Sequence, residues 1–294
     1  MIGWAYQSGR YLPLEEVRLP VHDAGFAMGV TATDQCRTYS GKLFRLHDHL
    51  DRFQRSCAIC KLQLRLQSAE LSKIINEVLQ RSQQSEPAVP EWSVVWLMTG
   101  GVVGNYLGLP GGILQAEPEL IVYAFPFSDV RFQHFYERGA VVRIARSITS
   151  PGGPWTSAKQ RSRLHWWLAE QEVKNIHPEA QALLLDRDGF LTETSIANII
   201  LVQNGRLQTP RSSRVLTGVT LQVVKELSAQ LALQWEEADL REDDLKNIEE
   251  LLLISTPFGI APVGNLDGRK LPINGPVFTK LWSAWQQLTA EQTA

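Results

Sequence analysis

Residues Gln181 to Thr209, QALLLDRDGFLTETSIANIILVQNGRLQT, alternate between apolar runs and turn-forming residues. The run that begins at Ala182 ends in Asp186-Arg187-Asp188-Gly189, which suits a tight turn and tolerates a positive φ angle. The run from Ile196 to Val202 ends in Asn204-Gly205, a strong two-residue signal for a β-hairpin. We therefore predict largely buried strands joined by tight turns in this part of the chain.

Glu193 lies among these apolar strands. A buried carboxylate without a partner costs several kcal/mol, so a buried Glu193 needs a cationic or hydrogen-bond-donating partner. The alternative from this stretch alone is a strand-edge residue that faces water, because Glu is rarely buried without a pair.

The overall composition is that of a globular protein. The 294 residues are 44% hydrophobic and 20% charged, and this length is sufficient for two modest domains and a substantial core. The formal net charge is −2, and no basic stripe like that of a nucleic-acid-binding protein is present. We therefore expect neither nucleic acid nor an anionic membrane as a partner.

The sequence contains no sign of a membrane span or a signal peptide. No apolar run approaches the roughly 18 residues that a membrane-spanning helix needs. Residues 1–10, MIGWAYQSGR, lack the charged-then-apolar layout of a signal peptide. A reducing cytoplasm is therefore the expected location.

The three cysteines, Cys36, Cys57 and Cys60, are an odd set and predict no disulfide framework. Cys57-x-x-Cys60 could suggest redox or zinc chemistry, but no second pair accompanies it. Both thiols follow the helical periodicity of Leu50 and Phe53, so we predict that they face the core.

The sequence His47-Asp48-His49 offers two alternate histidines without a third ligand, which is weak support for a metal site. Asp48 is better explained as the N-cap of the helix that carries Leu50 to Cys60. No metal is expected.

Apolar periodicity divides the rest of the chain into helices and strands, and no internal repeat is present. A hairpin with a turn at Ser8-Gly9 opens the chain. The glycines between Gly100 and Gly112 do not fit the G-x-G-x-x-G fingerprint, which argues against a Rossmann domain. A glycine-rich segment of this kind is typical of the flexible loops that line active sites. The other predicted elements are strands at Leu43 to Leu46, Trp92 to Met98, Leu120 to Phe125, Val141 to Ile148 and Glu250 to Ser255, and helices at Ser68 to Ser82, Arg161 to Val173, from Val219 onwards, and Pro276 to Leu288.

Several motifs, in this order along the chain, resemble the class IV aminotransferases. These are the pyridoxal-phosphate (PLP) enzymes of fold type IV, which include branched-chain and D-amino-acid aminotransferases, some amine transaminases and aminodeoxychorismate lyase. The resemblance extends from about Gly3 to Leu271. The matching residues are Asp23-x-Gly25-x-x-x-Gly29, Arg37-x-Tyr39-x-Gly41, Phe44-x-Leu46-x-x-His49-x-x-Arg52 and Asp186-x-x-Gly189-x-x-x-Glu193-x-x-x-x-Asn198.

This resemblance implies an α/β (α+β) protein with the two-domain architecture of fold type IV. A smaller N-terminal α/β domain would span residues 1–126 and an interdomain linker residues 127–137. A larger C-terminal PLP-binding domain with a pseudo-barrel would span residues 138–294. The cofactor would lie between the domains, and the protein would be a homodimer.

The resemblance also implies a set of cofactor-binding residues. Lys159 would form the Schiff base, although a lysine before a helix is usually solvated. Arg52 would bind the phosphate, for which a planar guanidinium is suited, although a solvated arginine is the common case. Glu193 would keep the pyridine nitrogen protonated, so that the ring accepts electrons. Further phosphate ligands would be the N–H groups and hydroxyls of Gly218, Val219, Thr220 and Thr256.

Some positions depart from the family pattern. Leu221 stands where the family usually continues with arginine, which puts support for the phosphate site in doubt. Ala32-Thr33-Asp34-Gln35 replaces an aromatic-Glu pair, so an aromatic that often contacts substrate is missing. The Arg-x-His carboxylate trap of D-amino-acid aminotransferases is absent where Asn105-Tyr106-Leu107 stands.

The implied activity is transfer of an amino group between an amino acid and a 2-oxo acid, with branched-chain amino acids as candidate substrates. Arg37, Asn105 and Tyr106 are the candidate substrate residues, although Arg37 is equally well explained as a solvated strand residue. An aminodeoxychorismate lyase is the first alternative. A non-catalytic PLP-binding protein is the second, motivated by Asp34-Gln35 and Leu221.

Overall fold

The computed structural model describes residues 2–104, 108 and 118–291. Contacts between residues divide the chain into two compact units. The first unit contains the residues up to Ser128 together with Ala158–Ser162, and the second contains Asp129–Ser157 and the residues from Arg163 onwards. Each unit has a β-sheet with helices, which confirms the mixed class. The predicted boundaries at residues 126, 137 and 138 stay a prediction.

The first unit is built on a six-stranded sheet. Its strands are β1 (Trp4–Gln7), β2 (Arg10–Pro13), β3 (Thr31–Tyr39), β4 (Lys42–Leu43), β5 (Trp92–Thr99) and β6 (Leu120–Pro126). Their order is β2-β1-β6-β5-β3-β4, and neighbours are antiparallel. Within the described residues, strand β4 pairs with Thr38 and Tyr39 of β3 alone, so the N-terminal half of β3 has an edge that β4 does not cover.

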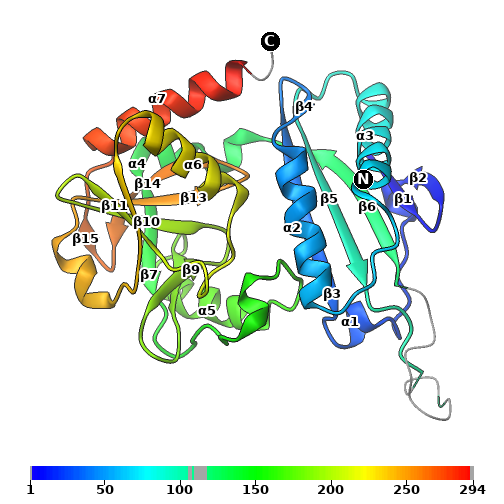
Figure 1. The fold of residues 1–294 in the computed structure, drawn as a ribbon, viewed down its shortest axis with the longest axis horizontal. Coiled ribbons are helices and arrows are strands. Elements are labelled where there is room, and N and C mark those ends of the chain that lie inside the picture. The colour runs from blue at the N-terminus through cyan, green and yellow to red at the C-terminus, as the bar shows by residue number, and fades with distance from the viewer. Residues whose placement is uncertain (1, 105–107, 109–117, 292–294) are drawn as a thin grey trace. The chain divides into compact units, whose positions relative to one another are not determined.

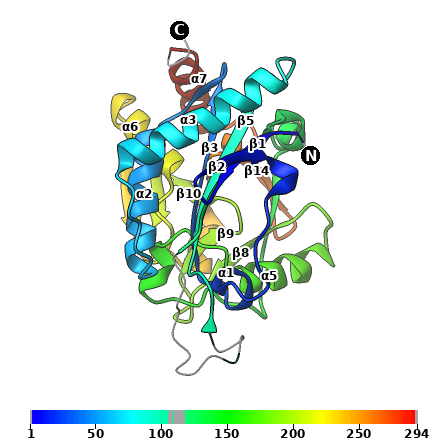
Figure 2. The ribbon, with the colours of Figure 1, turned by 90° about the vertical axis from the view of Figure 1, so that its right-hand side faces the viewer.

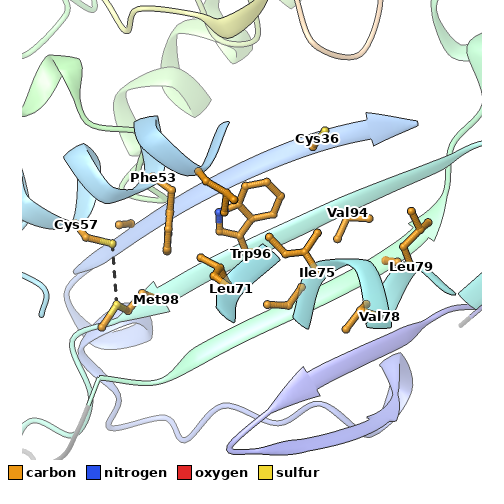
Figure 3. Close-up of a cluster of buried hydrophobic side chains, with 14 of the residues drawn as sticks. Cys36, Phe53, Cys57, Leu71, Ile75, Val78, Leu79, Val94, Trp96 and Met98 are labelled. Carbon is orange, nitrogen blue, oxygen red and sulfur yellow. Dashed lines mark hydrogen bonds between the residues drawn. The ribbon is translucent and has the colours of Figure 1, made fainter. Parts of the chain in front are cut away.

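Two long helices, α2 (Leu46–Ile59) and α3 (Ser68–Ser85), cover one face of this sheet (Figure 2). A short helix, α1 (Ala24–Ala27), and a 3₁₀ turn at Leu14–Glu16 complete the unit. The core between helices and sheet is apolar because α2 contributes Phe53 and Cys57, α3 contributes Ile75, and β5 contributes Trp96 (Figure 3). Cys57 Sγ lies 4.0 Å from the sulfur of Met98, and the predicted core position of this cysteine is confirmed.

The second unit contains a nine-stranded mixed sheet that curls into half a barrel (Figure 1). Its strands are β7 (Ala140–Ile144), β8 (Gln181–Leu185), β9 (Leu191–Thr194), β10 (Asn198–Gln203), β11 (Arg206–Pro210), β12 (Gln234–Ala238), β13 (Glu250–Ser255), β14 (Gly259–Leu266) and β15 (Arg269–Lys270). The order is β12-β11-β10-β13-β14-β7-β8-β9, with β15 paired to β14. The pseudo-barrel expected for this half is thus confirmed.

Four α-helices accompany this sheet among the described residues. They are α4 (Gln133–Arg138), α5 (Leu164–Lys174), α6 (Val219–Gln230) and α7 (Pro276–Glu291). Short 3₁₀ turns occur at Asp129–Phe132, Pro154–Ser157 and Glu242–Asn247. Helices α6 and α7 pack against each other and against β13 (Figure 1). No helix in the described part of the chain has the length and apolar character that crossing a membrane needs.

The helix predicted to begin at Asp48 begins earlier. Helix α2 starts at Leu46, and its N-cap is Arg45 in the left-handed conformation, with φ of 55°. Asp48 lies in the first turn, where its carboxylate contacts Arg45 Nη1 at 3.3 Å. The N-cap prediction for Asp48 is therefore wrong, because a left-handed residue at position 45 starts the helix before the usual capping side chain.

Candidate active site

Residues Ala158–Ser162 form a segment that lies along the uncovered edge of β3. The Thr33 N–H donates to the Lys159 carbonyl over 2.9 Å. Two residues further, the Arg161 N–H donates to Thr31 Oγ1 over 2.8 Å. The segment is far from β3 in sequence, yet these bonds attach it to the first unit. Lys159 itself is half-buried.

Ser56 joins Lys159 to helix α2. Its hydroxyl accepts a hydrogen bond from the Lys159 N–H at 3.0 Å and donates to the Arg52 carbonyl at 2.9 Å. Arg52 and Ser56 are four residues apart and therefore lie on the same helix face. The structure thus brings Lys159 and Arg52, two of the predicted site residues, to the same face of α2.

The Arg52 side chain is buried and paired with Asp34 on β3. Arg52 Nε and Nη2 donate to the two Asp34 carboxylate oxygens at 2.8 and 2.7 Å. His49 Nδ1 lies 2.9 Å from Asp34 Oδ1. Asp34 is fully buried, and Arg52 is 4% exposed. The alternative of a solvated Arg52 is therefore wrong, and the Nη1 side of its guanidinium is the side that Asp34 does not engage.

Charge and burial oppose each other in this cluster. Burial alone raises the pKa of Asp34, but the charge and hydrogen bonds of Arg52, together with His49, outweigh burial and hold the pKa of Asp34 well below its usual range. Burial lowers the pKa of His49, and the charges of Arg52 and Lys159 lower it further against the opposing effect of Asp34. At neutral pH the cluster therefore combines a carboxylate, a guanidinium and a neutral imidazole.

This neutral, buried His49 predicts a pH dependence of stability. The pKa of His49 is lower in the folded than in the unfolded chain, so the unfolded state binds more protons below about pH 6.5. The free energy of unfolding therefore decreases as the pH decreases, by up to about 1.4 kcal/mol per pH unit. Replacing His49 by Gln should flatten the fall of the unfolding free energy between about pH 6.5 and 5, measured by urea denaturation. His47→Gln is the control, because that side chain is 82% exposed. Equal slopes for His49→Gln and the unmodified protein would contradict the prediction.

Glu193 lies on β9 in the second unit and has hydrogen-bond donors around it. Its Oε1 accepts from the Leu216 N–H at 3.2 Å, and its Oε2 accepts from Asn198 Nδ2 at 3.1 Å. The same Asn198 nitrogen donates to the Leu216 carbonyl at 2.8 Å. Glu193 is half-buried on β9, the last strand in the sheet order, and both of its carboxylate oxygens accept hydrogen bonds.

The N-terminus of α6 is adjacent to Asn198. Gly218 is the N-cap and offers no side chain to the first N–H groups of the helix. A Cβ atom on Gly218 would lie 2.3 Å from Asn198 Oδ1, so this close approach requires glycine. The following Val219 and Thr220 are buried, and a helix start of this kind suits an anion. Thr256 lies in the turn between β13 and β14.

The candidate substrate residues are placed in part. The guanidinium carbon of Arg37 lies 4.3 Å from the Tyr39 ring centre and 3.8 Å from that of Phe127, and Arg37 is 4% exposed. The alternative of a solvated Arg37 is therefore wrong. Asn105 and Tyr106 lie outside the described residues. A role for these three residues in substrate binding stays a prediction.

The cysteines lie in unreactive surroundings. Burial raises the pKa of Cys57 to about 12 and also raises the pKa of Cys36 and Cys60. All three thiols are free. In the described parts of the chain, no group of three or more His, Cys, Asp or Glu side chains is arranged to hold a metal ion.

Each unit, taken by itself, contains groups of the kinds that a phosphate-bearing pyridine cofactor needs. The first unit supplies an amine, Lys159, and a buried guanidinium, Arg52. The second unit contains a carboxylate, Glu193, and the start of helix α6, whose N-cap Gly218 makes no side-chain hydrogen bond to the first N–H groups. Leu221, which replaces an expected arginine, is 7% exposed and packs as an apolar core residue of α6.

Sequence reasoning missed the partners of Lys159 and Arg52. Asp34, His49 and Ser56 were not among the predicted site residues. A signal was present, because His49, Arg52 and Ser56 have the spacing i, i+3 and i+7 and form a polar stripe on a helix that is otherwise packed by apolar residues.

A family model described as amino-transferase class IV matches residues 31–266. The D-alanine aminotransferase of Bacillus licheniformis is 24% identical over 290 residues, which are 98% of this chain and 97% of the relative. The putative branched-chain-amino-acid aminotransferase of Methanocaldococcus jannaschii is 27% identical over 265 residues, which are 90% of this chain and 88% of the relative.

Solved structures share the fold over nearly the full length. The branched-chain amino acid aminotransferase of Escherichia coli superposes with a TM-score of 0.88 at 21% identity and covers 100% of this chain and 97% of its own. The branched-chain aminotransferase of the archaeon Thermoproteus uzoniensis, solved with norvaline, gives a TM-score of 0.84 at 22% identity and covers 98% of this chain and 94% of its own.

Proposed function

This chain belongs to the class IV aminotransferases, a family of PLP-dependent enzymes, and we propose that it moves an amino group between an amino acid and a 2-oxo acid through Lys159. The observation that carries this proposal is that Ser56 on α2 bonds both the Lys159 N–H and the carbonyl of Arg52, which is four residues earlier on the same helix. An amine that binds the cofactor and a cation that binds its phosphate are the two groups that this chemistry first requires.

Each proposed residue has a defined task. PLP, when bound, supplies the electron sink for the reaction. Lys159 holds the cofactor and, once released, moves a proton as a general base. Arg52 binds the phosphate through the side of its guanidinium that Asp34 does not engage. Glu193 receives hydrogen bonds from Asn198 and Leu216, which orient its carboxylate to hold a proton on the pyridine nitrogen.

Four other residues are proposed as phosphate ligands. Gly218, Val219 and Thr220 would donate through the N–H groups that begin α6, and Thr220 also through its hydroxyl. Thr256 would donate through its hydroxyl from the turn after β13.

We propose branched-chain amino acids as the substrate class. The neighbouring folds named as branched-chain aminotransferases support this choice. The D-alanine aminotransferases among the relatives support the competing class, although the Arg-x-His trap is absent from residues 105–107.

The test is the visible absorption spectrum of the purified protein. L-leucine, L-glutamate, D-alanine and a simple chiral amine are added in separate cuvettes, and conversion to the pyridoxamine form of the cofactor is measured. We expect L-leucine and L-glutamate to convert it. Conversion by D-alanine alone would assign a D-amino-acid aminotransferase, and conversion by the chiral amine alone an amine transaminase. A band that no donor changes would favour the lyase, and no band with PLP supplied would favour the non-catalytic protein.

We also propose that the protein is a homodimer. Leu164, Trp167 and Leu168 are 69%, 63% and 44% exposed, and their i, i+3, i+4 spacing puts them on one face of α5. Such a cluster is typical of an interface.

The Trp167→Glu variant should shift the mass measured by light scattering from dimer to monomer. Leu231→Glu is the matched control, because Leu231 is an exposed apolar residue at the end of α6, away from this face in sequence. A monomeric unmodified protein would contradict the proposal.

A cytoplasmic location is proposed as well, and the free thiols of Cys36, Cys57 and Cys60 support it, because free cysteines are typical of a reducing compartment. Fractionation of cells that express the tagged chain tests this location.

A further inference from the structure

We propose that Ser56 is a positioning residue that fixes Lys159 relative to Arg52. This inference rests on the proposed function of Lys159 and Arg52 and adds a third residue, which acts through the backbone of the other two. Ser56 is completely buried on α2. Its single hydroxyl contacts the backbone of both residues, as acceptor from the Lys159 N–H at 3.0 Å and as donor to the Arg52 carbonyl at 2.9 Å.

The need for such a contact follows from the sequence. Lys159 lies outside any regular helix or strand, in a segment that follows a short 3₁₀ turn at Pro154–Ser157. A side chain on such a segment points reproducibly only if the backbone is held. The bond from Thr33 fixes the Lys159 carbonyl, and the bond to Ser56 fixes the Lys159 N–H. The two bonds hold both peptide groups of the residue.

Ser56 differs from Thr33 in the element to which it attaches Lys159. Thr33 belongs to the sheet, whereas Ser56 lies one helical turn after Arg52 on α2. The same helix carries His49, whose pKa is lowered mainly by burial and to a small extent by the charge of Lys159. Through Ser56, the amine that binds one end of the cofactor is therefore set at a fixed place relative to the cation that binds the other end.

The first unit contains a natural control for this role. Ser82 on α3 is also completely buried, donates to the carbonyl four residues earlier, Val78, at 2.8 Å, and accepts a distant backbone N–H, that of Trp4, at 2.9 Å. Replacement of either serine by alanine removes the same two kinds of hydrogen bond. Of the two serines, Ser56 is the one bonded to Lys159, so a difference between the two variants reports on Lys159 and not on general loosening.

The experiment compares Ser56→Ala, Ser82→Ala, Ser56→Thr and Lys159→Ala in the full chain freed of cofactor. The first readout is the rate at which each protein captures added PLP, followed by absorbance, with the adduct trapped by borohydride and located by mass spectrometry. A misplacement of about 1 Å can cost about a hundredfold in rate, so we expect Ser56→Ala to capture PLP about tenfold to a hundredfold more slowly. Ser82→Ala should capture it at the unmodified rate.

The second readout is hydrogen exchange of the backbone amides without cofactor. Ser56→Ala should expose the Lys159 amide to exchange at least about tenfold faster, because that N–H loses its acceptor. Ser56→Thr should restore both readouts, because threonine keeps the hydroxyl and bonds the same carbonyl within a helix.

Equal slowing of capture in Ser56→Ala and Ser82→Ala would overturn the inference, as would an unchanged rate in Ser56→Ala. Either result would leave the proposed function standing as long as Lys159→Ala forms no trapped adduct. If Lys159→Ala still forms the adduct at the unmodified rate, the proposed function fails, and the role of Ser56 fails with it.

Discussion

Replacement of Lys159 by alanine is expected to abolish both the covalent attachment of PLP and the transfer of amino groups. The amine is the only group of this residue that can form the bond to the cofactor and then act as a base, and removal of a general base alone typically costs about 10² to 10⁴ in rate. Because two steps lose the same group, we expect turnover to fall at least about a thousandfold, near the upper part of that range. The measurement is the visible spectrum of the variant with PLP, together with turnover of the best donor found for the unmodified protein.

The matched control is Lys280→Ala, because Lys280 is an exposed lysine on α7. It should retain the spectrum and the turnover of the unmodified protein. A Lys159→Ala variant that keeps a tenth or more of the turnover would contradict the proposed role. In that case borohydride trapping followed by mass spectrometry would identify the lysine that carries the cofactor.

The hairpins of the second unit could be predicted from sequence because their turn chemistry is local. Asn204 and Gly205 have φ angles of 50° and 70°, and Gly189 has a φ of 78°. These are the left-handed conformations that Asn and Gly adopt at low cost. Strands β10 and β11 pair around the Asn204-Gly205 turn as expected. Where a few adjacent residues determine the conformation, the pattern predicts the structure.

Pairings between distant segments could not be predicted in the same way. Strand β12 is parallel to β11, and its sequence, QWEEA, has no apolar run to indicate a strand. Residues 158–162 lie against β3 through hydrogen bonds to Thr31 and Thr33, which are more than 100 positions away in sequence. Nothing in the local sequence predicts these contacts, because their partner is the N-terminal half of β3, whose edge is free to pair only because β4 is short.

The candidate site shows the same limit. The motifs predicted Lys159, Arg52 and Glu193, but the motif positions do not show which side chains neutralise them. In the sequence, Asp34 stands out only as a departure from an aromatic-Glu pair, whereas the structure shows it as the partner of Arg52. A carboxylate on a strand and a guanidinium on the next helix meet only when the helix packs on that face of the sheet.

Replacement of Asp34 by asparagine is therefore expected to destabilise the first unit strongly. The carboxylate accepts from Arg52 Nε and Nη2, from the Gln35 N–H at 2.7 Å, and contacts His49. An amide group cannot accept with both of its polar atoms, so Arg52 is left as a buried, partly unpaired cation. Breaking a buried pair in this way costs about 3–5 kcal/mol. Urea denaturation of the protein without cofactor measures the loss.

Asp48→Asn is the matched control, because Asp48 also faces an arginine, Arg45 at 3.3 Å, but on the half-exposed side of α2. Such a pair contributes at most about 1 kcal/mol. If Asp34→Asn lowers the free energy of unfolding no more than Asp48→Asn does, the buried pair of Asp34 and Arg52 does not stabilise the fold as we infer.

The origin of the loss can be separated from simple loss of contacts by a second replacement. If the cost of Asp34→Asn comes from the unpaired charge of Arg52, the double variant with Arg52→Met should lose less unfolding free energy than the sum of the two single losses, by about 0.5–3 kcal/mol.

Acid pH provides an independent check. Because the pKa of Asp34 is held below its unfolded value, its contribution is present above about pH 4 and is lost as the pH falls through the folded pKa. The stability difference between the unmodified protein and Asp34→Asn should therefore shrink below about pH 4, whereas a difference caused by packing alone would stay constant with pH.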